Sequence, residues 1–198
     1  MPVFSPSSLR NIKKPIERHW KQPGWYRWWA PAEVCRELLT EFADQIIPEL
    51  TEGNDELLGH YLVYVGMTKE TLYSRVIKWH ICESHNFGKV HHRTLSTFRQ
   101  TVSSLTVGNW ADELTTNNAI DKMKVEVFPV DLIVGSPETK SHLKSLEGLQ
   151  ISQHLVPLNI QGNRDSRLAD FHKHLSKRRK LGRERGLQEL MKEVSGEK

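Results

Sequence analysis

The stretch from Tyr61 to His80 combines a strand, a glycine turn and a helix that carries one arginine. Its first five residues are aromatic, β-branched or aliphatic and stop at Gly66, which predicts a strand that ends in a turn. Apolar residues then recur at helical spacing, and Arg75 lies among them. A strand, a turn and a helix with one basic side chain form a common arrangement for holding a phosphate group.

A carboxylate lies inside the apolar face of a second predicted helix, which runs from about 138 to 155. Glu147 falls one turn after Leu143 and one turn before Ile151. Burying a carboxylate costs desolvation energy unless a metal ion, an arginine or hydrogen-bond donors meet it. Glu147 is therefore a candidate site residue, and the alternative is a glutamate at the edge of the apolar face whose head reaches water.

Two other polar clusters could carry function. His85, His91 and His92 lie close in sequence, but none forms an i, i+4 pair and no cysteine or acidic set completes a metal cage. Solvated loop histidines, or contacts to phosphate, are the favoured interpretation. The segment from Phe171 to Gly186 holds seven Lys or Arg against one Glu, which predicts a basic helix that is either a solvated face or a nucleic-acid contact.

Composition sets the outer limits. The chain has 198 residues, 37% hydrophobic and 26% charged, with a net charge of +4, as in a globular protein of one domain with a tail. Only Cys35 and Cys82 occur, so a disulfide framework is excluded and a reducing, cytoplasmic location is expected. No apolar signal core or membrane-length apolar stretch is present, and no membrane association is expected.

The remaining elements follow from periodicity and breakers. Residues 1–23 are expected to form an N-terminal arm. The Trp-rich stretch 24–31 lies between two prolines and predicts a short strand, whose tryptophans pack in the core or cover it. Helices are predicted over 32–50 and 94–105, a strand over 124–130, and the stretch 109–121 is ambiguous.

Five of these elements occur in the order of a known family. They are GWY at 24–26, YVG at 64–66, Arg75, Glu147 and the Asn159 of PLN. In this order the chain resembles the GIY-YIG nuclease superfamily over residues 24–163, and it also resembles the compact restriction endonucleases of that superfamily. The resemblance implies an α/β (α+β) fold with a central, three-stranded antiparallel sheet flanked by helices. Residues 164–198 would then form a basic helical tail.

The resemblance also implies a chemistry, which is metal-assisted hydrolysis of phosphodiester bonds in DNA. Glu147 would hold one divalent ion, Mg²⁺ or Mn²⁺. Tyr26 would position or deprotonate the attacking water, and Tyr64 would support it through a hydrogen bond. Arg75 would neutralise charge on the scissile phosphate, and Asn159 would brace the site and help to bind substrate.

The chain departs from the family pattern at three places. The two tyrosine motifs lie about forty residues apart, so the helix over 32–50 must be an insertion between the first two strands. The position one turn after Arg75, which in the family is commonly His, Tyr or Lys, is Trp79, and His80 follows it. Since five residues turn an α-helix by about 140°, His80 can share the face of Arg75 only if the helix bends or ends. His80 is retained as a candidate catalytic residue.

Basic residues complete the expected site. Met67 occupies a position that is often Lys in the family, and Lys69 would supply the positive charge instead. Lys69 is therefore a candidate substrate-binding residue. Arg178 and Arg179 in the basic tail would hold the DNA backbone.

Two other function classes remain open at this level, and the nuclease interpretation itself divides in two. A catalytically inactive GIY-YIG domain would bind nucleic acid without cutting it, and a protein-interaction domain using the Trp-rich stretch would do neither. A restriction-type enzyme would be expected to form a homodimer, whereas a repair or mobile-element enzyme could act as a monomer. The recognition sequence, and the choice of DNA over RNA beyond the family resemblance, do not follow from the sequence.

Overall fold

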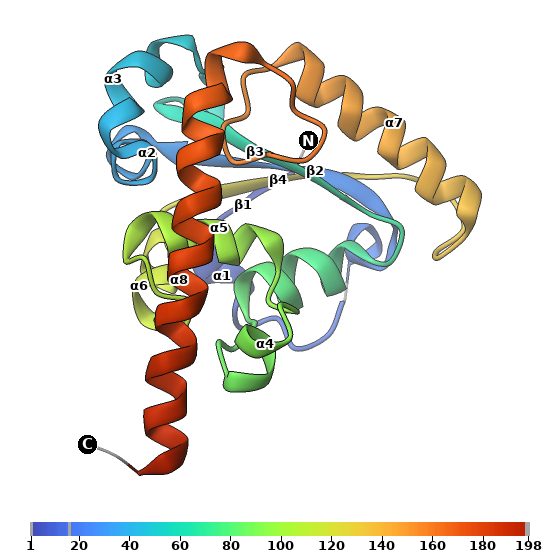
Figure 1. Cartoon of the computed structure of the whole chain (residues 1–198). Coiled ribbons are helices and arrows are strands. Elements are labelled where there is room, and N and C mark those ends of the chain that lie inside the picture. The colour runs from blue at the N-terminus through green and yellow to red at the C-terminus, as the bar shows by residue number, and fades with distance from the viewer. Residues whose placement is uncertain (1, 16, 197–198) are drawn as a thin grey trace.

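The computed structural model describes residues 2–15 and 17–196 and builds them around one antiparallel sheet (Figure 1). The strands, which pair in the order β1-β4-β2-β3, are β1 (Val3–Phe4), β2 (Gly24–Pro31), β3 (His60–Thr68) and β4 (Lys124–Pro129). The α-helices are α1 (Pro6–Leu9), α2 (Ala32–Leu39), α3 (Ala43–Ile46), α4 (Phe87–His91), α5 (Thr97–Thr106), α6 (Glu113–Asp121), α7 (Pro137–Gln153) and α8 (Ala169–Ser195). A π-helix, η5 (Tyr73–Ile81), follows β3, and short 3-10 turns are η1 (Arg18–Lys21), η2 (Thr40–Phe42), η3 (Ile47–Glu49), η4 (Asp55–Leu57) and η6 (Ser166–Leu168).

The mixed α/β architecture agrees with the sequence, but the sheet has four strands where three were expected. The additional strand is β1, which pairs with β4 through Val3 opposite Glu126 and Phe4 opposite Val125. A two-residue strand is too short for alternation to reveal it. Residues 1, 16, 197 and 198, which belong to the expected arm and tail, lie outside the described residues.

The N-terminal segment also contributes to the core. Leu9 and Trp20 are buried, and the Trp20 ring lies 5.0 Å from the Phe4 ring. Arg10 forms an ion pair with Asp121 of α6 at 2.8 Å. The described part of this segment is therefore packed against the sheet and helices, where the sequence alone predicted an extended arm.

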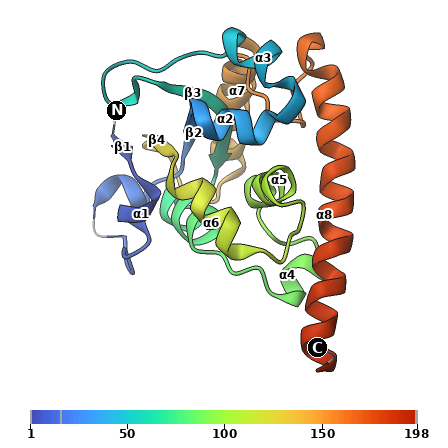
Figure 2. The same ribbon diagram turned by 90° about the vertical axis from the view of Figure 1, so that its left-hand side faces the viewer.

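The two faces of β2 are covered by different helices. Tyr26 and Trp28 point into the main core, where the Trp28 ring stacks on Phe98 of α5 at 4.4 Å. Trp29 packs on the opposite face in a smaller cluster with Ile151 of α7. Figure 2 shows α5 beside α8, and their contact makes α8 an outer layer over α5. The Trp-rich strand is thus core on both faces, as one of the two sequence interpretations held.

The segment between β2 and β3 is helical, as the spacing of the two tyrosine motifs required. The expected single helix over 32–50 is instead α2 followed by η2, α3 and η3, because Thr40 has a positive φ of 51°, which a helix does not allow. The ambiguous stretch 109–121 contains α6, and the basic tail is the 27-residue helix α8.

The outer edge of β3 is covered by two segments from elsewhere in the chain. At one end, the amides of Gly53 and Leu62 form hydrogen bonds of 2.9 Å with the carbonyls of His60 and Thr51. At the other end, the Leu158 amide donates to the Val63 carbonyl at 3.0 Å. These bonds satisfy backbone groups that an edge strand otherwise leaves unpaired.

The packing of the Tyr26 side chain requires a glycine at position 66. Tyr26 lies directly opposite Gly66 in the β2–β3 register. A Cβ added to Gly66 would lie 2.5 Å from the Tyr26 hydroxyl oxygen and 2.6 Å from its Cζ. The glycine of the YVG motif therefore leaves space for the buried Tyr26 ring.

We predict that Gly66→Ala destabilises the protein by about 1–3 kcal/mol, because the added methyl group displaces a fully buried side chain. The matched control is Gly148→Ala in α7, where an added Cβ meets nothing within 4 Å. This control should leave stability unchanged or raise it by up to ~1 kcal/mol, because alanine favours a helix over glycine. Urea unfolding measures both, and equal stability of the two variants would contradict the assigned role of Gly66.

Candidate active site

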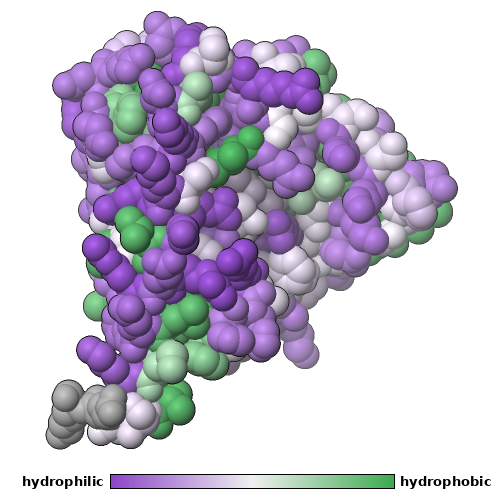
Figure 3. Space-filling model, in the orientation of Figure 1, coloured by the Kyte–Doolittle hydropathy of each residue, from purple (hydrophilic) through white to green (hydrophobic). Residues whose placement is uncertain are grey.

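A cavity of about 670 Å³ opens between η5, the end of β3, α7 and α8. Figure 3 shows this hydrophilic face, which is hollowed between the sides formed by α8 and α7. Five of the residues singled out in the sequence line the cavity: Tyr64, Arg75, Glu147, Asn159 and Arg179. Residues more than 100 positions apart therefore meet at one place.

Tyr26 and His80 lie beneath this cavity and are hydrogen-bonded to each other. The Tyr26 hydroxyl is 2.7 Å from His80 Nε2, and both side chains are fully buried. Burial raises the pKa of Tyr26 to about 12, an effect that the nearby Arg75 charge opposes. Burial also holds the pKa of His80 well below its usual value, and the charges of Arg75 and Arg99 act in the same direction. At neutral pH the pair is therefore an uncharged phenol and an uncharged imidazole.

The π-helix explains how His80 reaches this position. In η5 the hydrogen bonds join residues five apart, as in the 2.9 Å bond from the Cys82 amide to the Ile77 carbonyl. Residues five apart in such a helix lie above one another, as residues four apart do in an α-helix. Arg75 and His80 therefore share a face, and both contact the Tyr26 hydroxyl. In an α-helix the two side chains would point in different directions, and the π-helix removes this obstacle.

Behind His80, a further set of polar groups fixes the imidazole ring. His80 Nδ1 is 3.0 Å from Ser96 Oγ, at the N-terminus of α5. The Ser96 amide in turn donates to Glu83 Oε2 at 2.7 Å, and Glu83 forms an ion pair with Lys89 at 3.0 Å. These contacts hold the ring in one orientation and provide a partner for each of its nitrogens.

Arg75 bridges the buried pair and the cavity. Its Nε donates to the Tyr26 hydroxyl at 3.4 Å, and its guanidinium lies 5.1 Å from the centre of the Trp79 ring. Among the described residues Arg75 forms no ion pair with a carboxylate, including Glu147. Arg75 and Glu147 therefore do not form a structural ion pair in the described part of the chain, and the Arg75 fork retains hydrogen-bonding capacity for a ligand.

Glu147 projects from α7 into the same cavity. Burial raises the pKa of its carboxyl group, and the charges of Arg75 and Lys144 offset part of this effect. Within the described part of the chain its side chain makes no hydrogen bond or ion pair. The Glu147 charge also acts to raise the pKa values of Tyr26 and Tyr64.

Tyr64 differs from its expected arrangement. Its hydroxyl makes no hydrogen bond to Tyr26 in the described structure, because the Tyr26 hydroxyl contacts His80 and Arg75 instead. Tyr64 lines the cavity, whereas Tyr26 is enclosed. Burial raises the pKa of Tyr64, Tyr26 adds to this effect, and Arg75 and Arg179 oppose it.

Asn159 connects the segment after α7 to the sheet. Its Oδ1 accepts from the Val65 amide at 2.8 Å, and its Nδ2 donates to the Val65 carbonyl at 2.7 Å. Because both ends of the amide are used in this way, Asn159 braces the strand that carries Tyr64. This agrees with the expected bracing, while its side chain in this arrangement has little capacity left for substrate.

Two expected substrate contacts lie away from the cavity. Lys69 is at the turn after β3, where its Nζ is 3.3 Å from the Gly135 carbonyl oxygen. Arg178 donates from Nε to the Ser104 carbonyl at 3.0 Å and so joins α8 to α5. His85, one of the three clustered histidines, is buried and accepts from Arg99 Nε at 2.6 Å. No group of three or more metal-ligating side chains occurs in the described residues.

Sequence reasoning did not identify Ser96, Glu83, Lys140 and Lys144. Ser96 and Glu83 support His80 through contacts across a loop, and no spacing rule links them to it. Lys140 and Lys144 lie one turn apart and line the cavity beside Glu147. Their i, i+4 spacing before the glutamate was the available signal.

Comparison with known proteins agrees with this geometry. The family model described as the GIY-YIG catalytic domain matches residues 24–181. The chain belongs to the GIY-YIG catalytic domain family. The match covers β2, β3, η5 and α7, which carry Tyr26, Tyr64, Arg75, His80 and Glu147, and extends into α8. No curated protein and no solved structure matches the chain. None of the described helices is long and apolar enough to cross a membrane.

The buried His80 should make stability depend on pH. Because its pKa is lowered in the folded state, the unfolded chain takes up a proton below about pH 6.5 that the folded chain does not. The free energy of unfolding should therefore fall with decreasing pH, by at most about 2 kcal/mol from this group at pH 5. Urea unfolding at pH 7.5, 6 and 5 measures how steeply the free energy of unfolding depends on pH. This slope should be shallower in His80→Gln. His92→Gln, which removes an exposed histidine, is the control; an unchanged slope in His80→Gln would contradict this role.

Proposed function

We propose that the chain is a metal-dependent endonuclease that hydrolyses phosphodiester bonds in DNA, with its reaction centre in the cavity between η5 and α7. The observation that carries the proposal is the meeting of three chemically distinct groups. These are the Arg75 guanidinium, which forms no ion pair among the described residues, the Tyr26–His80 hydrogen bond, and the Glu147 carboxylate, which has no hydrogen-bond or ion-pair partner among them. A structural core has no need of this combination, whereas phosphodiester hydrolysis needs an anion-binding group, a proton acceptor and a cation ligand.

Arg75 binds the scissile phosphate in this proposal. The guanidinium is held in place by stacking on Trp79, and it can donate two parallel hydrogen bonds to phosphate oxygens. The long 3.4 Å contact from Arg75 to Tyr26 is easily exchanged for a charged partner. Movement of the guanidinium toward the phosphate would free the Tyr26 oxygen on its cavity side.

Tyr26 and His80 then transfer the proton of the attacking water. We assign His80 as the tautomer with a hydrogen on Nδ1, which donates to Ser96 Oγ and leaves Nε2 free to accept. As water attacks phosphorus, its proton passes to the Tyr26 oxygen and the Tyr26 proton passes to His80 Nε2. The negative charge of the bound phosphate favours the imidazolium that forms, and solvent protonates the leaving oxygen. Tyr64, which lines the cavity, orients the water or a phosphate oxygen.

Glu147 is the residue that would hold a divalent ion. Its carboxylate is free of protein partners in the described structure, and a single carboxylate suits Mg²⁺, which keeps most of its waters and shares the substrate phosphate. When bound, the ion would stabilise the charge that develops on the phosphate during hydrolysis. Mn²⁺ fits the same oxygen donor.

The charge around the cavity suits a polyanionic substrate. Lys140 and Lys144 from α7 and Arg179 from α8 line it together with Arg75. Arg179 is partly buried, which lowers its pKa, while the nearby Tyr64 acts in the opposite direction. Four cations around one carboxylate favour a nucleic-acid backbone over a neutral or cationic ligand.

Cleavage of mixed plasmid and phage DNA with Mg²⁺ or Mn²⁺ tests the proposal. Glu147→Ala should lower the cleavage rate by about 100-fold or more, the scale on which loss of one charge-stabilising group acts. Glu138→Ala, which removes an exposed carboxylate from the first turn of the same helix, is the matched control and should cleave at the wild-type rate.

The pattern of products refines the conclusion. Discrete fragments that are lost in Glu147→Ala would identify a sequence-specific enzyme of restriction type, and diffuse nicking that is lost in the same way would identify a nonspecific or structure-selective one. DNA binding without cleavage of any substrate would indicate a catalytically inactive GIY-YIG domain instead.

A further inference from the structure

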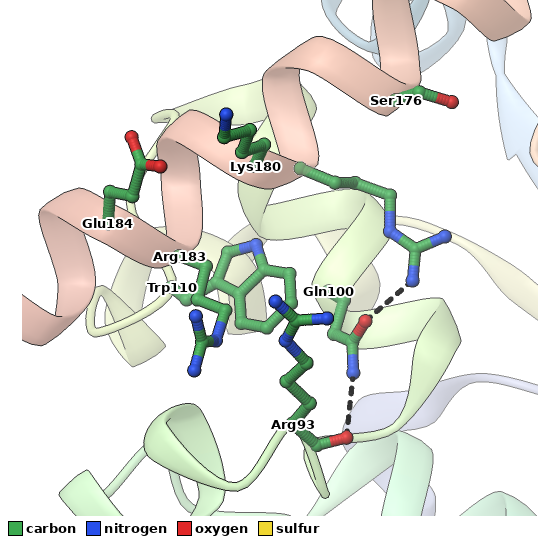
Figure 4. A pocket seen from close by; sticks show the side chains of 8 residues that line it. Arg93, Gln100, Trp110, Ser176, Lys180, Arg183 and Glu184 are labelled. Carbon is green, nitrogen blue, oxygen red and sulfur yellow. Dashed lines mark hydrogen bonds between the residues drawn. The ribbon is translucent and has the colours of Figure 1, made fainter.

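A second cavity, of about 430 Å³, lies beside the candidate active site between α8, α5 and the loop after α4. Its lining residues are Arg93, Gln100, Trp110, Ser176, Arg179, Lys180, Arg183 and Glu184 (Figure 4). Four of these side chains are cations and one is an acid. Of the four cations, only Arg179 also lines the candidate active site, so the cavity carries positive charge on Arg93, Lys180 and Arg183 that the catalytic proposal above does not use.

The cations in this cavity are not held by carboxylates. Among the described residues, none of the four forms an ion pair. Arg183 donates to the carbonyls of Val90 at 3.3 Å and His91 at 2.7 Å, and Arg179 donates to Gln100 Oε1 at 2.6 Å. The side chains of Arg93 and Lys180 make no hydrogen bond within the described chain. Gathering like charges is unfavourable unless an anion joins them, so the arrangement indicates an anionic ligand.

Two walls of the cavity are held by burial and hydrogen bonds, which suits a defined binding site. The Trp110 indole is buried, and its Nε1 donates to Ser104 Oγ at 2.7 Å. Arg93 adopts a left-handed backbone with φ of 57°, and its carbonyl accepts from Gln100 Nε2 at 3.4 Å. Figure 4 shows the Arg93 and Arg183 side chains beside Trp110 and Gln100. An apolar wall next to cations strengthens their field toward a ligand.

Arg179 connects this cavity to the candidate active site, because its side chain lines both. A ligand that carries anionic groups at regular intervals can therefore occupy both cavities at once. A phosphodiester backbone has this property, whereas a single free phosphate occupies only one.

We propose that this second cavity binds a non-scissile phosphate of the DNA whose neighbouring phosphodiester is cut at Glu147. Arg93 and Lys180 supply the contacts, and Arg179 lies between the two phosphates. The proposal rests on the proposed function for its choice of ligand, but it concerns binding and can be measured without cleavage.

Binding of duplex DNA in EDTA at several salt concentrations tests this site. Each phosphate contact adds roughly 0.9 to the slope of log affinity against log salt concentration. The double variant Arg93→Gln, Lys180→Gln should therefore lower the slope by about one unit. The matched control is Arg185→Gln, Lys192→Gln, which removes the same two residue types from exposed positions on α8 that line neither cavity.

The outcome separates the two proposals. A lower slope for the cavity variant, with a wild-type slope for the control, supports the phosphate site even if no DNA is cut. Equal slopes for both double variants, or no DNA binding by the wild-type protein, overturn it, even if cleavage is observed. Circular dichroism and thermal unfolding of both variants show whether either one has failed to fold.

Discussion

Tyr26 and His80 meet in the core because the segment that contains Arg75 and His80 is a π-helix, whose hydrogen bonds join residues five apart instead of four. Both are polar groups with no access to water, so each would be costly to bury alone. Their mutual hydrogen bond, with Ser96 behind the ring, removes that cost and orients the pair. The same winding places Arg75 on the shared face. The phosphate-binding group and the proton acceptor of the proposed reaction thus depend on a single helical irregularity.

The Glu147 carboxylate is positioned in the cavity by a different part of the fold. Glu147 is on α7, which packs on the face of the sheet opposite the Tyr26–His80 pair. The chain after α7 is attached to β3 by the two hydrogen bonds of Asn159 to Val65. This attachment fixes the end of α7 relative to Tyr64. The cavity therefore forms between two parts of the fold that are held in place separately: η5 with the Tyr26–His80 pair, and α7 with the segment that follows it. Gly66 provides the space for the Tyr26 ring.

The sequence predicted the main strands, the helical insertion and five of the residues that line the cavity, because these follow from periodicity, breakers and ordered motifs. It did not predict β1, whose two residues carry no pattern, or the division of the helix over 32–50 at Thr40. The role of His80 was open because sequence spacing presumes an α-helix. Ser96 and Glu83 were missed, since only tertiary packing brings them to the ring. The burial of His85 with Arg99 likewise has no local signal.

The covered edge of β3 has a consequence for how copies of the chain could associate. Thr51, Gly53, Leu158 and Asn159 occupy hydrogen-bonding positions along that edge, and the opposite edge of the sheet is the two-residue strand β1. A neighbouring molecule therefore finds little backbone with which to extend the sheet. This protects the folded chain against strand-by-strand polymerisation. Any symmetric pair that cuts both strands of a duplex would therefore meet without joining the β-sheets of its two copies.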